Sequence, residues 1–415
     1  MINSMGMNLV AELKERGFIQ DSSTDPERIF SENRTVYIGT DPTADSLHVG
    51  HLAWVMLMKR LSDAGHKVIL LVGGGTGMIG DPKEKGERSL MQESDIDKNA
   101  EALKNQLGKL LGQDAGFTMV NNAEWLREVK LLDFLRDIGK HFTVNDLIKR
   151  DLIRRRLETP DESISYTEFT YSLLQAYDFM ELNERYGCDL QVGGTDQWTN
   201  ILSGVDLIRK RTGKEVFALS LPLITDSAGK KFGKSEGNAV WLEATKTTPY
   251  HFYQFWLNVE DEKVIDYLKV YTLLSNDEID SIAESHKTEP GQRLAQKRLA
   301  EEVTTFVHGR EALDGVVAVS IALFKDGGLA TLEESEREAL TNYAPKYKVE
   351  AEEKAVDVLI NSGLAASKRE AREFIESGAV TLDGVKLSDP EAALEFPNMA
   401  VMKRGKKQAV LLVKN

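Results

Sequence analysis

The first half of the chain alternates short apolar runs with stretches in which apolar residues recur at helical spacing. Residues 35–39 form one apolar run, residues 51–64 carry a helical pattern, and residues 68–72 form a second run. A strand, a helix and a strand in this order are typical of a parallel α/β sheet. Four further segments extend the pattern, with strands expected over residues 117–121 and 190–193 and helices over residues 97–111 and 171–182.

The second half of the chain carries a different pattern. Residues 247–322 show little strand character and are expected to be mostly helical, with a capping box from Ser275 to Glu278. A small α+β module is expected after them, with helices from residue 356 and over 367–377, and strands near 379–382 and 408–413. We therefore expect four parts: a parallel-sheet domain with an insertion over residues 1–230, a loop and helical domain over 231–325, a linker over 326–348, and the α+β module over 349–415.

The charge balance narrows the possible partners. The 415 residues include 52 Lys or Arg and 66 Asp or Glu, which gives a net charge of −14. This charge opposes non-specific binding to nucleic acid or to an anionic membrane. Any nucleic acid must therefore be bound by a local basic patch.

Cysteine content and hydropathy indicate the compartment. Cys188 is the single cysteine, which excludes an intrachain disulfide and a cysteine zinc site. The longest strongly apolar run, residues 68–72, is far shorter than the roughly 20 residues that span a bilayer. Residues 1–18 lack the apolar core of a signal peptide. We therefore expect a cytoplasmic protein with no membrane association.

Three motifs are candidates for nucleotide binding, and two of them are weak. Residues 75–80 match G-x-G-x-x-G after a strand, but Asp81-Pro82 follows at once, which favours a glycine-rich turn over a dinucleotide site. Residues 228–235 approximate a P-loop but hold two lysines and a phenylalanine before the final lysine. A solvated basic loop is the alternative interpretation of that run.

The third motif, residues 42–51, lies between an expected strand and an expected helix. His48 and His51 flank Gly50 at the expected helix start. There the helix dipole and free backbone amides favour a phosphate, and Thr43 adds a donor. No further histidine or cysteine lies nearby to complete a zinc site. The motif therefore predicts a phosphate site without a protein-bound metal.

Taken together, His48-Val49-Gly50-His51 and Lys231-Phe232-Gly233-Lys234-Ser235 resemble the two signatures of class I aminoacyl-tRNA synthetases, HIGH and KMSKS. Three further runs narrow the resemblance to tyrosyl-tRNA synthetases of bacterial type: YIGTDPT at 37–43, YSLLQAYD at 171–178 and QVGGTDQW at 191–198. The resemblance covers essentially the whole chain. It implies a Rossmann-like catalytic domain, a helical domain and a small RNA-binding domain with the fold named after a small-subunit ribosomal protein.

The resemblance implies a two-step reaction. The carboxylate of L-tyrosine attacks the α-phosphate of ATP, pyrophosphate leaves, and tyrosine is transferred to the terminal adenosine of its tRNA. Magnesium is expected with the ATP phosphates. Such chemistry needs positioned hydrogen-bond donors rather than a nucleophile. The residues implied as catalytic are Thr43, His48, His51, Lys231, Lys234 and Ser235, with Lys85 and Arg88 as either further donors or a solvated face.

The same resemblance assigns the substrate pockets, although each side chain taken alone also has an ordinary structural explanation. Tyr37 and Asp178 would pair with the phenol hydroxyl of tyrosine, because that hydroxyl both donates and accepts. The other tyrosine contacts implied are Asp81, Tyr171 and Gln175 for the ammonium group, Gln197 for the carboxylate, and Gln191 behind the pocket. The ATP contacts implied are Gly39, Asp41, Gly50, His51, Gly193, Asp196 and Lys234, with Asp41 bracing its loop and Trp54 unusually bulky near the ribose.

The expected tRNA surface lies in the tail. It comprises seven cations, which are Lys368, Arg369, Arg372, Lys403, Arg404, Lys406 and Lys407. A merely solvated charged face is the alternative for such residues. Two rival functions stay open, namely the tryptophan enzyme of the same class and a non-catalytic RNA-binding protein. The resemblance also implies a homodimer joined by the insertion between the two halves of the sheet.

Overall fold

The computed structural model describes residues 4–82, 86, 90–112, 116–235, 238–324, 328–405 and 408–414. The chain forms two compact units. The first unit holds residues 1–241 and 260–288, and the second holds residues 242–259 and 289–415. This grouping follows the contacts within the fold, whereas the four parts expected from the sequence stay a prediction.

A six-stranded sheet forms the centre of the first unit. Its order is β1-β6-β5-β2-β3-β4, and all neighbours are parallel except β1 and β6. The strands are β1 (Asp21–Ser22), β2 (Thr35–Thr40), β3 (Lys67–Val72), β4 (Phe117–Asn121), β5 (Leu190–Gly194) and β6 (Phe217–Leu221). The four strands expected in this part of the chain are confirmed, and β1 and β6 are additions. The parallel α/β sheet domain is confirmed with them.

The strand order reverses beside β2. The chain lays down β2, β3 and β4 toward one edge and then returns to place β5 and β6 on the other side of β2. Connections therefore leave β2 and β5 in opposite directions. In open α/β sheets, ligands bind at the carboxyl ends of the strands at such a reversal. The carboxyl ends of β2 and β5 are followed by Asp41 and Asp196.

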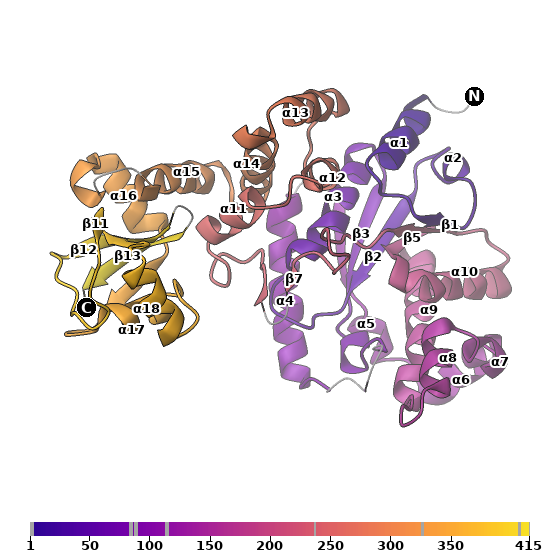
Figure 1. Ribbon diagram of the computed structural model, residues 1–415. Helices are drawn as coiled ribbons and strands as arrows, with labels where there is room; N and C mark the ends of the chain where they lie inside the picture. The colour runs from indigo at the N-terminus through magenta and orange to yellow at the C-terminus, as the bar shows by residue number, and fades with distance from the viewer. Residues whose placement is uncertain are drawn as a thin grey trace. The chain divides into compact units, whose positions relative to one another are not determined.

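Helices cover both faces of this sheet. Figure 1 shows α3 (Val49–Asp63) and α4 (Glu93–Leu111) on one side and α9 (Tyr166–Tyr186) and α10 (Trp198–Thr212) on the other. The helix α9 begins at a capping box in which Ser165 and Glu168 bond each other's backbone N–H groups. The remaining elements of this unit are α1 (Ser4–Glu15), α2 (Pro26–Ile29), η1 (Thr76–Met78), α5 (Ala123–Leu126), α6 (Leu131–Asp137), η2 (Gly139–His141), α7 (Val144–Leu147), α8 (Asp151–Glu158), η3 (Thr195–Gln197), β7 (Lys234–Ser235), β8 (Asn238–Ala239), α12 (Val264–Tyr271) and α13 (Asn276–Thr288).

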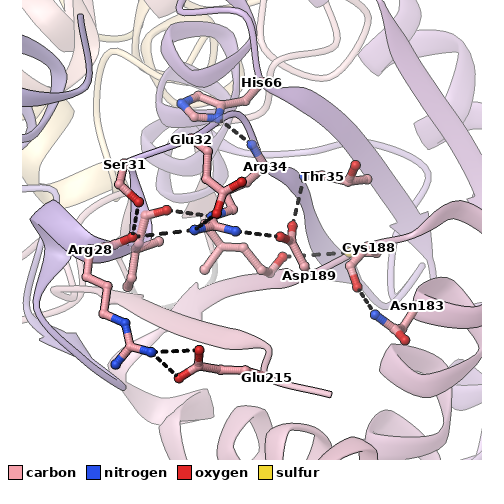
Figure 2. Close-up of polar contacts among 12 residues, drawn as sticks. Arg28, Ser31, Glu32, Arg34, Thr35, His66, Asn183, Cys188, Asp189 and Glu215 are labelled. Atoms are coloured by element: carbon pink, nitrogen blue, oxygen red, sulfur yellow. Dashed lines mark hydrogen bonds and ion pairs between the residues drawn. The ribbon is translucent and has the colours of Figure 1, made fainter. Parts of the chain in front are cut away.

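A closed polar network ties the amino ends of the parallel strands together (Figure 2). The buried guanidinium of Arg34 donates to Asp189 Oδ2 at 3.0 Å and lies 4.6 Å from the ring centre of Phe217. Asp189 Oδ1 accepts the backbone N–H of Thr35 at 2.9 Å. His66 Nδ1 accepts the backbone N–H of Arg34 at 2.9 Å. The amino edges of β2, β3, β5 and β6 are therefore fixed to one another.

The second unit combines a helical part and a small mixed sheet. Its helices are α11 (Pro249–Leu257), η4 (Pro290–Gln292), α14 (Leu294–His308), α15 (Arg310–Phe324), η5 (Gly328–Thr331), α16 (Glu334–Tyr343), α17 (Ala355–Asn361) and α18 (Lys368–Glu376). Its sheet has the order β11-β10-β12-β13-β9, formed by β9 (Lys346–Val349), β10 (Val380–Leu382), β11 (Val385–Lys386), β12 (Met399–Arg404) and β13 (Gln408–Lys414). The expected helical stretch, the α+β module and the capping box at Ser275 and Glu278 are confirmed. None of the helices in the described ranges is long and apolar enough to cross a bilayer.

Candidate active site

The first signature segment caps helix α3. The Nδ1 atom of His48 accepts the backbone N–H of Gly50, and the Nδ1 atom of His51 accepts the backbone N–H of His48, both at 3.1 Å. The centres of the two rings lie 3.9 Å apart. Because each Nδ1 atom is an acceptor, the neutral imidazoles carry their protons on Nε2. Both histidines are therefore N–H donors at a helix N-terminus, as a phosphate site requires.

The second signature lies in a loop, residues 224–235, that folds back on itself. The backbone N–H of Phe232 donates to the carbonyl of Ile224 at 2.9 Å, and the short strand β7 follows where a P-loop would need a helix. The ammonium group of Lys231 lies 3.5 Å from Oδ2 of Asp196, just beyond β5. The roles of the Lys234 and Ser235 side chains stay predictions. We call residues 224–235 the lysine loop.

The G-x-G-x-x-G run forms a turn. Residues 76–78 make the short 3₁₀ helix η1, and Gly80 has a φ of +80°. No α-helix starts at the glycines, as a dinucleotide site would need. The backbone at Gly73 leaves room for Asp41, since an added Cβ would lie 2.1 Å from Asp41 Oδ1. Lys85 and Arg88 lie outside the described residues.

Two cavities meet at the carboxyl edge of the sheet. The smaller, of about 220 Å³, is lined by His48, Gly50 and an apolar wall over residues 221–224. The larger, of about 410 Å³, extends to Tyr37 and Asp178. Five residues line both cavities, namely His51, Trp54, Gly194, Asp196 and Lys231. A nucleotide in the smaller cavity and an amino acid in the larger would therefore meet at these shared residues.

The sequence-derived pocket residues come together in the larger cavity. Those expected at tyrosine all line it, namely Tyr37, Asp81, Tyr171, Gln175, Asp178, Gln191 and Gln197. Five residues expected at ATP also line it, namely Gly39, Asp41, His51, Gly193 and Asp196, as does Thr43, expected to be catalytic. Residues from β2, α9 and β5 thus converge as the motif runs predicted, although their assigned contacts stay predictions.

The floor of this cavity holds buried polar atoms without a partner. Tyr37 and Gln191 are 1% and 3% exposed and pair with each other in register on β2 and β5. Among the described residues, neither the Tyr37 hydroxyl nor Oε1 of Gln191 has a hydrogen-bond partner. Leaving such an atom unpaired costs roughly 1–3 kcal/mol. A ligand that hydrogen-bonds these atoms offsets that cost.

The carboxylate of Asp178 is held by two residues that the sequence did not identify. Trp125 donates its indole N–H to Oδ1 at 2.7 Å, and Asn122 donates its amide N–H to Oδ2 at 2.9 Å. Burial raises the pKa of Asp178 to about 7, and these two hydrogen bonds limit the rise. Asn122 directly follows β4, so its place at the carboxyl edge was a usable signal, whereas Trp125 offered none.

The polar end of the cavity is also hydrogen-bonded. Asp81 Oδ2 accepts from the Gln197 amide at 2.6 Å. The Tyr171 hydroxyl donates to Asp41 Oδ2 at 2.8 Å, and the hydroxyl of Thr76, a further unpredicted residue, donates to Oδ1 at 2.7 Å. These two hydrogen bonds tie Asp41 to α9 and η1, and its expected role in bracing the loop stays a prediction. Two neighbouring carboxylates, Asp41 and Asp81, give this end the charge that an ammonium group requires.

The expected tRNA cations of the tail form ion pairs within the second unit. Lys368 pairs with Asp357 at 2.8 Å, Arg369 with Glu373 at 3.0 Å, Arg372 with Glu391 at 2.9 Å and Arg404 with Glu370 at 3.7 Å. The pairs of Lys368, Arg369 and Arg372 are exposed, and such pairs contribute little to stability and exchange readily for other anions. Lys403 lies on β12, and Lys406 and Lys407 lie outside the described residues. A metal-binding group of three or more His, Cys, Asp or Glu is absent from the part of the chain that is described.

Comparisons with known proteins bear on this site. The family model described as tRNA synthetases class I (W and Y) matches residues 31–325. The tyrosine–tRNA ligase 1 of Vibrio parahaemolyticus is 46% identical, over 97% of this chain and 98% of that protein. This chain belongs to the tyrosine–tRNA ligase family of class I synthetases. Membership confirms the resemblance drawn from the two signatures.

Further matches support the same family. The tyrosine–tRNA ligase of Staphylococcus haemolyticus is 46% identical, over 97% of this chain and 98% of that protein. A C-terminally truncated mitochondrial tyrosyl-tRNA synthetase of Aspergillus nidulans shares the fold with a TM-score of 0.67 and 33% identity, over 74% of this chain and 92% of that one. A model for the C-terminal domain of tyrosine–tRNA ligases matches residues 336–412. Both the class I fold and the family-specific tail are therefore present.

Proposed function

We propose that the chain activates L-tyrosine with ATP, releases pyrophosphate, and transfers the tyrosyl group to the terminal adenosine of a tyrosine tRNA. One observation carries this proposal. The unpaired Tyr37 hydroxyl lies with the Asp178 carboxylate on the lining of the larger cavity. A phenol hydroxyl donates to a carboxylate and accepts from a second hydroxyl, so the side chain of tyrosine satisfies both groups.

The same pair of groups discriminates against similar amino acids. Phenylalanine brings no hydroxyl, so the Tyr37 hydroxyl would stay unpaired at roughly 1–3 kcal/mol, and Asp178 would keep only its bonds from Trp125 and Asn122. The indole of tryptophan donates one hydrogen bond and accepts none. It would leave the Tyr37 hydroxyl without an acceptor. The cavity therefore favours tyrosine over the substrate of the rival synthetase.

The activation step is catalysed by positioned donors. The Nε2–H groups of His48 and His51, the Thr43 hydroxyl and the ammonium of Lys231 surround the junction of the two cavities, and Lys234 and Ser235 complete the set. As tyrosine attacks the α-phosphate, negative charge grows on the phosphate oxygens, and these donors stabilise it. Magnesium enters as the MgATP substrate, bound mainly through the phosphates.

The transfer step needs a route for the tRNA end. A third cavity, of about 570 Å³, adjoins the cavity that is lined by Tyr37 and Asp178. The two share Asp81, Gln197 and Lys231, and the third cavity continues to Arg150 and Arg155. Its two arginines suit the phosphates of a polynucleotide strand. In the tail, Lys368, Arg369 and Arg372 with the other expected cations would bind tRNA by exchanging their carboxylate partners for phosphates. This exchange is compatible with a net charge of −14 on the chain.

We also propose a cytoplasmic homodimer. Several large apolar side chains on the insertion are exposed, among them Leu131 (71%), Leu132 (77%) and Val144 (62%). Exposed apolar side chains on one short segment of the chain are typical of a protein interface. The same surface on a second copy would cover them, because a two-fold interface uses one patch twice. The single, buried cysteine suits a reducing compartment.

The test is ATP–pyrophosphate exchange measured with each of the twenty amino acids separately and magnesium supplied. We expect exchange with tyrosine alone. Exchange with tryptophan would keep the synthetase class and overturn the assigned pocket. The absence of exchange in folded protein would favour the non-catalytic RNA-binding alternative. Gel filtration with light scattering tests the dimer, and a monomer at micromolar concentration would contradict it.

A further inference from the structure

Among residues 222–233 of the lysine loop and its approach, one side chain is buried. Every residue from 222 to 233 is described, and Phe232 alone among them is buried, at 8% exposure. The neighbouring Lys231 side chain is 58% exposed. A buried aromatic ring next to the exposed residues 227–231 needs a partner surface, because burial of a ring is what stabilises its position.

That surface is helix α12. The ring of Phe232 stacks on Tyr267 with centres 4.3 Å apart and planes inclined by 36°, and its centre lies 5.8 Å from that of Tyr271. Both tyrosines are buried. The hydroxyl of Tyr267 also donates to the carbonyl of Thr225, on the other limb of the lysine loop, at 3.1 Å. One helix therefore holds both limbs of the loop.

The opposite side of the loop is pressed against helix α3. Gly233 has a φ of +75°, and a Cβ added to it would lie 2.1 Å from Cγ2 of Val49. No other residue type fits between the loop and the helix at this point. The loop is thus fixed at Phe232 and Gly233, between the aromatic rings of α12 and the first turn of α3.

This fixed point lies next to Lys231, which with Asp196 lines all three cavities. Lys231 lines the smaller cavity, where the nucleotide would bind, the larger cavity, where tyrosine would bind, and the third cavity. Its backbone forms a β-bridge with Thr225, which is the residue that Tyr267 holds. Any shift of Phe232 or Tyr267 would therefore move the Lys231 ammonium relative to Asp196 and the reacting phosphates.

We infer that Phe232, seated on Tyr267 and Tyr271, is a positioning residue that sets the place of Lys231 in the activation step. The inference rests on the proposed function and adds α12 to the apparatus of the reaction. None of these three aromatic residues needs to touch the substrate. A catalytic donor displaced by about 1 Å can cost a factor of about 10² in rate, so the loss of this stacking should appear in kcat.

The first experiment compares Phe232→Leu with Phe30→Leu in tyrosine-dependent ATP–pyrophosphate exchange. Phe30 is the matched control, since it is 2% exposed, packs edge-on against His66 at the amino edge of the sheet, and lies far from Lys231. We expect F232L to lower kcat about tenfold, with the dissociation constant of tyrosine within about twofold of wild type. F30L should keep kcat within about twofold at a comparable loss of thermal stability. Equal kcat in the two variants would overturn the inference.

A double-variant cycle with Lys231 tests the mechanism. If Phe232 acts through Lys231, Phe232→Ala should lower kcat by up to about 100-fold in the wild-type background and by less than about threefold in Lys231→Ala. Losses that multiply in the double variant would contradict this. Should F232A not fold, Tyr267→Leu removes the stacking from the other side and should lower kcat about tenfold. If the wild-type protein shows no exchange activity, the proposed function and the inference are both overturned. If the wild type is active and the Phe232 and Tyr267 variants keep its kcat, the inference alone is overturned.

Discussion

The two edges of the parallel sheet differ in whether their buried polar atoms are paired. At the amino edge, Arg34 and Asp189 bond each other and the surrounding backbone, and His66 accepts a backbone N–H (Figure 2). In the larger cavity, which reaches down from the carboxyl edge, Tyr37 and Gln191 each bury a polar atom that no described residue pairs. Tyr37 lies on the same strand, β2, whose first residue bonds Asp189. One strand therefore carries a paired polar group at Thr35 and, two residues later, an unpaired one that faces the cavity.

This difference separates stability from function. Paired buried groups stabilise a fold modestly, whereas each unpaired one destabilises it by roughly 1–3 kcal/mol. The carboxyl edge bears that cost in the ligand-free protein and recovers it when a substrate hydroxyl arrives. We therefore expect substitutions at the carboxyl edge to change substrate use, and those at the amino edge to change the free energy of unfolding.

The largest effect is expected from Asp178→Ala. It removes a charged hydrogen-bond acceptor for the substrate and leaves the phenol unpaired, so kcat/KM for tyrosine should fall by about three orders of magnitude. The thermal midpoint should change by only a few degrees. Pyrophosphate exchange and thermal denaturation measure the two quantities on the same preparation. A loss of activity fully explained by unfolding would contradict the assignment of Asp178 to the ligand.

Arg34→Ala is expected to lower stability and leave activity nearly unchanged. Removing one partner of a buried ion pair leaves Asp189 with an uncompensated charge, which should lower the free energy of unfolding by about 3 kcal/mol. Activity per folded molecule should stay within about threefold. The matched control is Arg28→Ala, because Arg28 forms an exposed pair with Glu215 at the same edge, worth less than about 1 kcal/mol. Equal destabilisation by both variants would mean that burial at this edge does not matter.

The sequence predicted the parts of the fold that depend on local pattern. Residues 68–72 are continuously apolar because β3 is covered on both faces, and the expected strand matched within one residue. The strand β12 was missed, since Met399–Arg404 ends in two basic residues and has no clear alternation. That α12 and α13 belong with the sheet unit rather than with the other helices depends on tertiary contacts, which periodicity does not encode.

The site shows the same division between local and distant information. Motif runs identified Tyr37, Asp178 and Gln191 because each lies inside a recognisable segment. Asn122 and Trp125 were missed, because they reach Asp178 across 56 and 53 residues of sequence. The stacking of Phe232 on Tyr267 is equally remote. Sequence motifs therefore located the groups expected to touch substrate, and the structure supplied those that hold them in place.

A smaller effect on substrate use is expected from Trp125→Phe. The substitution keeps the ring and removes the N–H that stabilises the Asp178 carboxylate, so the pKa of Asp178 should rise above about 7. The affinity for tyrosine should fall about tenfold at neutral pH and recover as the pH is raised. Isothermal titration between pH 6.5 and 9 measures this. A loss independent of pH would mean that Trp125 acts on the shape of the pocket rather than on the carboxylate.

The smallest effect distinguishes the two edges by the sign of their pH dependence. Burial raises the pKa of Asp178 to about 7, so the folded protein holds this proton more tightly than the unfolded chain, and its contribution to stability falls as pH rises from about 4 to 7. Burial, with the nearby Arg34 charge, lowers the pKa of His66, so its contribution is complete above about pH 6.5 and is lost as the pH falls below that value.

Urea denaturation between pH 4 and 8 separates these contributions. Relative to wild type, Asp178→Asn should gain stability as the pH rises, because its destabilising carboxylate is gone. His66→Gln, whose amide oxygen can still accept the Arg34 N–H, should gain stability as the pH falls, because no imidazole remains to be protonated. If the stabilities of both variants relative to wild type changed with pH in the same direction, Asp178 and His66 would not titrate as their burial requires. Changes in opposite directions would show that Asp178 is a destabilising carboxylate whose role is to bind a ligand. They would also show that His66 stabilises the fold in its neutral form.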